Sequence, residues 1–93
     1  MIKIAFDVDG TLIKQNRDGL DIPHYKVIYL LRLLREILDV DSIYIWSGSG
    51  FDYAKRWKEK LDLPGHVIVK GSIPVDIAFD DEEVNLGKVN IKV

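Results

Sequence analysis

Short apolar runs recur along this chain and predict four buried β-strands. The runs cover residues 2–6, 42–46, 67–69 and 75–79, and polar or charged residues end each of them. Residues 89–93 instead alternate apolar and polar side chains, which predicts an edge strand with one face in water. The chain therefore contains enough strand segments for one small sheet.

Two further segments repeat their apolar residues at helical spacing. Residues 51–61 carry apolar side chains on one face, which predicts an amphipathic helix. Residues 25–38 are apolar around most of the helix, so we expect burial on more than one side, within the monomer or partly against another subunit. A homo-oligomer is therefore left open. The polar, turn-rich residues 13–23 predict a loop or a small hairpin.

The order of these segments predicts an α/β fold. Strands and helices alternate, and continuously apolar strands are typical of a parallel sheet with helices on its faces. A chain of 93 residues has room for one domain, residues 1–93. The net charge of −2 argues against a protein that coats nucleic acid, and the lack of cysteine excludes disulfides and thiol catalysis. We expect a cytoplasmic protein with no membrane partner.

Residues suited to phosphate or magnesium follow each predicted buried strand. In a parallel sheet these positions meet at one edge, where ligands bind. They are Asp7 and Asp9, Ser47, Lys70, and Asp80 with Asp81. Taken singly, each has an ordinary interpretation: the first acids can cap a turn, Ser47 can be a turn residue, Lys70 can be solvated, and Asp80 and Asp81 can belong to a solvated acidic run.

Together these residue types match the needs of phosphate-ester hydrolysis. A carboxylate can act as the nucleophile, provided that cations screen the negative charge of the phosphate. Mg²⁺ accepts carboxylate ligands, and Lys70 adds a second positive charge. Ser47 and the amides around Gly48 can hydrogen-bond the phosphoryl oxygens, and Asp9 can exchange a proton with the leaving group and with water.

Residues 7–11, Asp-Val-Asp-Gly-Thr, resemble the first motif of the haloacid-dehalogenase-like superfamily of phosphohydrolases. The later motifs of that superfamily are similar in order to Ser47, Lys70 and Asp80-Asp81, so the resemblance spans residues 2–81. Lys55 is a rival for the lysine. The resemblance implies roles for nine residues, as follows. Asp7 is the nucleophile and a metal ligand, and Asp9 is the general acid/base and a ligand through its backbone carbonyl. Asp80 and Asp81 bind Mg²⁺, Asp81 directly or through water. The residues that bind phosphate are Gly10, Thr11, Ser47, Gly48 and Lys70.

The same resemblance implies a Rossmann-like three-layer fold with helices on both faces and no cap domain. Because Asp9 is present, it implies a magnesium-dependent phosphatase. A non-catalytic phosphoryl-acceptor or regulatory domain and a polynucleotide-end phosphatase are the alternatives. The substrate class stays open among sugar phosphates, nucleotides, polynucleotide ends and phosphoproteins, and nucleic acid enters only as a substrate.

Overall fold

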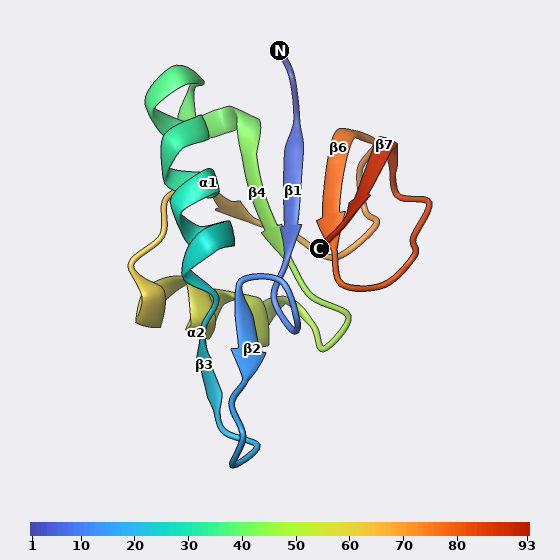
Figure 1. Ribbon diagram of the computed structural model, residues 1–93. Helices are drawn as coiled ribbons and strands as arrows, with labels where there is room; N and C mark the ends of the chain where they lie inside the picture. The colour runs from blue at the N-terminus through green and yellow to red at the C-terminus, as the bar shows by residue number, and fades with distance from the viewer.

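A computed structural model describes all 93 residues and has an α/β fold built on a five-stranded parallel sheet (Figure 1). The strand order is β5-β4-β1-β6-β7, and every neighbouring pair is parallel. The sheet strands are β1 (Ile4–Asp7), β4 (Ile43–Trp46), β5 (His66–Val67), β6 (Val75–Asp80) and β7 (Gly87–Lys92). The other elements are the antiparallel hairpin of β2 (Ile13–Gln15) and β3 (Asp21–Pro23), the helices α1 (Tyr25–Ile37) and α2 (Phe51–Leu61), and a short 3₁₀ turn, Val40–Ser42.

The central strand β1 aligns the ends of its two neighbours. Its residues are buried, which fits the continuous apolar run that predicts it. Asp7 pairs with Trp46 of β4, and Phe6 pairs with Phe79 of β6. The residues that follow these pairs, Ser47 on one side and Asp80 on the other, therefore emerge beside Asp7 at the same edge of the sheet.

Both helices pack against the same face of the sheet. One core cluster joins Ile4, Phe6 and Ile45 of the strands to Leu31 of α1 and Ala54 of α2. The prediction of helices on both faces is therefore wrong. The steps from β1 to β4 and from β4 to β5 run in the same direction along the sheet, and right-handed crossovers then place both helices on one side.

Loops cover the opposite face of the sheet. Its buried side chains are Ala5, Trp46, Val75 and Ala78, and Ile68, Ile73 and Leu86 from the connecting segments are among the residues that pack on them. The chain reaches β6 and then β7 through residues 68–74 and 81–86, and neither segment forms a helix. The molecule consequently lacks the third layer that the resemblance implies.

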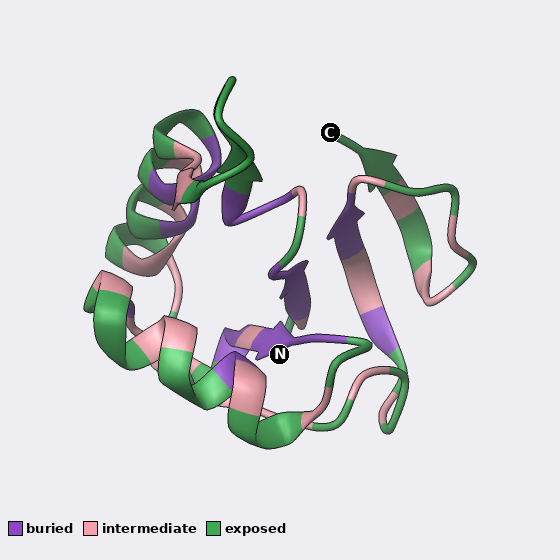
Figure 2. Ribbon diagram, turned by 90° about the horizontal axis from the view of Figure 1, so that it is seen from below, coloured by how far each residue is buried: buried purple, intermediate pink, exposed green.

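Helix α1 is buried along one side only. Val27, Ile28 and Leu31 are its buried residues, while Tyr29 and Ile37 are more than half exposed. The expectation that the monomer core covers more than one side of this helix is therefore wrong, because the opposite side faces away from the sheet (Figure 2). A partner subunit on that side stays a prediction.

The remaining segments agree with the sequence apart from details of length. The hairpin predicted within residues 13–23 is present and extends beyond the ends of the sheet strands (Figure 1). Strand β5 has only two residues, so Lys70 lies in a loop rather than directly after a strand. Strand β7 is an outer strand of the sheet, which confirms the predicted edge position. The alternating pattern, however, assigns its polar residues to the water, whereas the apolar Val89 and Ile91 are themselves exposed. No helix has the length and apolar character needed to cross a bilayer.

Candidate active site

The predicted site residues meet at the carboxyl edge of the sheet. One cavity of about 200 Å³ is lined by residues from three strand ends and the loop before β6. Its lining residues are Asp7, Asp9, Ser47, Gly48, Ser49, Lys70, Asp80, Asp81 and Glu82. None of them is hydrophobic, so the cavity is suited to a strongly polar ligand such as a phosphate group with its counterions.

Lys70 bridges two buried carboxylates in this cavity. Its Nζ donates to Asp80 Oδ2 at 2.8 Å and to Asp7 Oδ1 at 3.2 Å. Both carboxylates are almost fully buried, with exposed fractions of 5% for Asp7 and 2% for Asp80. Burial tends to lower the pKa of Lys70, but its hydrogen bonds and the two negative charges outweigh burial and raise that pKa. Lys70 is therefore a permanent cation at neutral pH.

Asp7 occupies an environment that opposes its negative charge. Burial and the neighbouring charge of Asp80 raise the pKa of Asp7 from 3.8 to about 6, although Lys70 acts in the opposite direction. One lysine thus does not balance the carboxylates of this site. A divalent cation would reverse the effect, because it favours the ionised form of its ligands.

Three carboxylates lie close enough together to hold such a cation. Asp7, Asp80 and Asp81 each place an oxygen within 4.8 Å of the other two. Burial and a hydrogen bond with Asp80 raise the pKa of Asp81, which indicates carboxyl groups crowded against one another. Hard oxygen donors at this spacing fit Mg²⁺, so the donor set is compatible with the predicted metal.

Gly10 makes room for the Asp81 side chain. The backbone at Gly10 has φ +76°, and a Cβ on this residue would overlap the Asp81 carboxylate. Thr11 follows but is fully buried, and it lines neither this cavity nor the adjoining one. The role in phosphate binding predicted for Thr11 consequently gains no support from its position.

The loop after β4 presents a hydroxyl and open backbone. Ser47 Oγ accepts a hydrogen bond from Ser49 N at 3.0 Å, which leaves the Ser47 proton available for an anion. Gly48 lines the cavity and has no atoms near the position of a Cβ, so a ligand can approach its backbone closely. Both residues therefore lie where the sequence predicts contacts to phosphate.

Lys55, the rival lysine, is not part of this cluster. It lines a separate cavity with Phe51 and His66 at the other side of α2. The structure therefore brings Lys70, and not Lys55, to the acidic residues.

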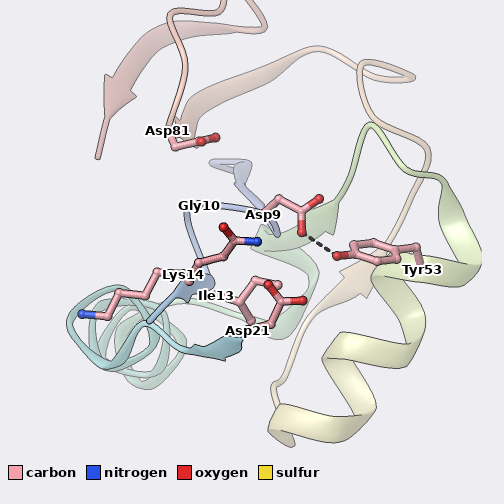
Figure 3. A pocket seen from close by; sticks show the side chains of 8 residues that line it. Asp9, Gly10, Ile13, Lys14, Asp21, Tyr53 and Asp81 are labelled. Atoms are coloured by element: carbon pink, nitrogen blue, oxygen red, sulfur yellow. Dashed lines mark hydrogen bonds between the residues drawn. The ribbon is translucent and has the colours of Figure 1, made fainter. Parts of the chain in front are cut away.

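Asp9 lies at the open side of the cluster and has a partner that the sequence analysis does not include. The Tyr53 hydroxyl donates a hydrogen bond to Asp9 Oδ1 at 2.5 Å. Figure 3 marks this bond with a dashed line. Burial and this hydrogen bond raise the pKa of the Tyr53 phenol, so the phenol stays protonated and remains a donor. The sequence signal for Tyr53 is its place in the first turn of the helix that follows the Ser47 loop, since such a residue lies near the strand ends.

A second, larger cavity of about 510 Å³ adjoins the first. The two share Asp9 and Asp81, and the hairpin supplies most of the remaining wall of the larger one. Its lining residues are Asp9, Gly10, Ile13, Lys14, Gln15, Asp21, Tyr53 and Asp81 (Figure 3). The hairpin is therefore placed to contact whatever extends from a ligand held in the first cavity.

Comparisons with known proteins found no match to this chain among family models, curated proteins or solved structures.

Proposed function

We propose that this protein is a magnesium-dependent phosphatase of the haloacid-dehalogenase-like type, in a small form without a cap domain. The observation that carries the proposal is the Lys70 bridge between two buried carboxylates from adjacent strand ends. Burying Asp7 and Asp80 together is unfavourable unless the site binds a cation or performs chemistry. The motif order of the sequence supports the same activity.

In this proposal Asp7 attacks the phosphorus atom of a phosphate monoester. A bond forms between a carboxylate oxygen and phosphorus while the bond to the leaving alcohol breaks, and Asp9 transfers a proton to the leaving oxygen. Asp9 then removes a proton from water, which attacks the aspartyl-phosphate, releases inorganic phosphate and restores Asp7. Mg²⁺ bound by Asp7, Asp80 and Asp81 would neutralise charge on the phosphoryl oxygens. Lys70 adds a fixed positive charge to the same site.

The position of Asp9 favours hydrolysis over a stable phosphoryl-acceptor function. Asp9 lines the cavity that contains Asp7, and it is exposed to solvent, from which the second reactant must come. Tyr53 occupies one of its oxygens and leaves the other for the leaving group or water. A regulatory acceptor domain has no need of such a group.

The test is release of inorganic phosphate from p-nitrophenyl phosphate with Mg²⁺ present. We expect the wild-type protein to be active, and both EDTA and Asp7→Asn to reduce the rate by at least about a thousandfold. Asp18→Asn, at the exposed tip of the hairpin, is the matched control and should retain activity. Full activity in the Asp7→Asn protein would refute the nucleophile. A stable beryllofluoride adduct without any turnover would favour the acceptor domain.

A further inference from the structure

The larger cavity is the place for the leaving group if the proposed function is correct, and the inference that follows rests on that function. Asp9 must reach the oxygen that departs from phosphorus, and Asp9 is shared by the two cavities. With phosphate held among Asp7, Ser47 and Lys70, the alcohol extends past Asp9 toward the hairpin. The residues of the larger cavity then determine which alcohols fit.

The wall around Tyr53 is negatively charged. Asp9 and Asp21 lie on either side of the Tyr53 hydroxyl, whereas the amine of Lys14 points away from both (Figure 3). Asp21 is exposed on β3 and takes part in none of the ion pairs of the structure. A negatively charged leaving group would therefore meet two carboxylates and no facing cation.

We propose that this cavity selects phosphate esters whose alcohol carries a positively charged amine, over esters whose alcohol carries a further phosphate or carboxylate. An ammonium group near Asp21 would be attracted by the negative charge of that carboxylate, and the ring of Tyr53 offers an additional favourable contact for a cation. The proposal makes Asp21 a specificity-determining residue. It also disfavours polynucleotide ends and nucleoside polyphosphates, because both carry further phosphate groups.

Three substrates with leaving groups of similar size provide the test: ethanolamine phosphate, 2-hydroxyethyl phosphate and phosphoglycolate. We expect kcat/KM to fall in that order, with about a tenfold difference between the first and the last at low ionic strength. The difference should narrow in about 0.5 M salt, since exposed charges are screened there. An equal rate for the three substrates, or faster hydrolysis of phosphoglycolate, would overturn the proposal.

Variants of Asp21 attribute the selectivity to this wall. Asp21→Asn should reduce the tenfold difference to about threefold, and Asp21→Lys should make phosphoglycolate the better substrate of the two charged esters. Asp18→Asn removes a charge from the same hairpin outside the cavity, so it should leave the order unchanged. An unaltered order in Asp21→Lys would remove Asp21 from the explanation and overturn the proposal.

Hydrolysis of p-nitrophenyl phosphate separates failure of this inference from failure of the proposed function. If the aryl ester is hydrolysed but the three small esters show no charge preference, only the selectivity proposal is wrong. If no ester is hydrolysed, including the aryl ester, both proposals are wrong.

Discussion

Replacing Asp7 with asparagine should stabilise the metal-free protein while it removes activity. The raised pKa means that the folded state holds the Asp7 proton more tightly than the unfolded state does, so ionisation at higher pH costs folding free energy. A rise from 3.8 to about 6 corresponds to about 3 kcal/mol above pH 7, at about 1.4 kcal/mol per pKa unit. Because asparagine carries no charge, Asp7→Asn should recover up to that amount at pH 8.

The sign of the effect fixes how it depends on pH. At pH 4 Asp7 is protonated in the folded state and about 40% protonated in the unfolded state, so the gain should shrink to less than about 1 kcal/mol. As the pH rises from about 4 to about 6, the free energy of unfolding of the wild type should fall progressively relative to that of Asp7→Asn. For a domain of this size, about 3 kcal/mol at pH 8 corresponds to a rise in Tm of roughly 12–24 °C.

Urea and thermal unfolding in EDTA at pH 4 and pH 8 measure this difference directly. Asp18→Asn is the control, because it removes an exposed charge and should change stability by less than about 0.5 kcal/mol. The reasoning is refuted if Asp7→Asn is no more stable than the wild type at pH 8. It is also refuted if the gain at pH 4 equals the gain at pH 8, since burial of a charge would then not be the cause.

Three further predictions concern Mg²⁺ binding, the hydrogen bond from Tyr53 to Asp9, and Gly10. Mg²⁺ should raise the Tm of the wild type at pH 8 but have at least about tenfold weaker affinity for the asparagine variant; equal affinities would contradict the carboxylate site. Tyr53→Phe should lower kcat about threefold to tenfold, because Asp9 loses the hydrogen-bond donor that orients it. An unchanged kcat would show that this hydrogen bond does not contribute to the reaction. Gly10→Ala should weaken Mg²⁺ binding by displacing Asp81, whereas Gly19→Ala, which has the same backbone strain in open space, should not; similar affinities in a calorimetric titration would argue against displacement.

The meeting of acidic side chains at one edge of the sheet was predictable from the sequence, because strand periodicity is local and parallel strands all end at the same edge. Asp7 and Asp80 each end a continuous apolar run, and the carboxyl ends of parallel strands lie along one edge of a sheet. That their strands, β1 and β6, are direct neighbours is seen only in the structure. The position of Lys70 depended on a loop after the two-residue strand β5, so its contact with both acids required the structure.

The arrangement of the helices could not be predicted in the same way. Which face a helix covers depends on the order of the strands, and apolar periodicity carries no information on that order. The exposed side of α1, with Tyr29 and Ile37, shows the same limit: the pattern says that a surface is apolar but not what covers it. Tyr53 was missed because its role follows from the direction in which α2 leaves the Ser47 loop.

The pairing of β1 with its neighbour β6 has a consequence for folding during synthesis. Near the start of these two strands, the backbone amide of Lys3 donates a hydrogen bond to the side chain of Asp76, 73 residues later. Asp7 and Asp80 end the same two strands, so the two halves of the acidic centre come from distant parts of the chain. During synthesis the acidic centre therefore cannot assemble before Asp80 and Asp81 have been made, and closing so long a loop is slow. If the protein has the proposed phosphatase activity, that activity would therefore report that β6 has paired with β1.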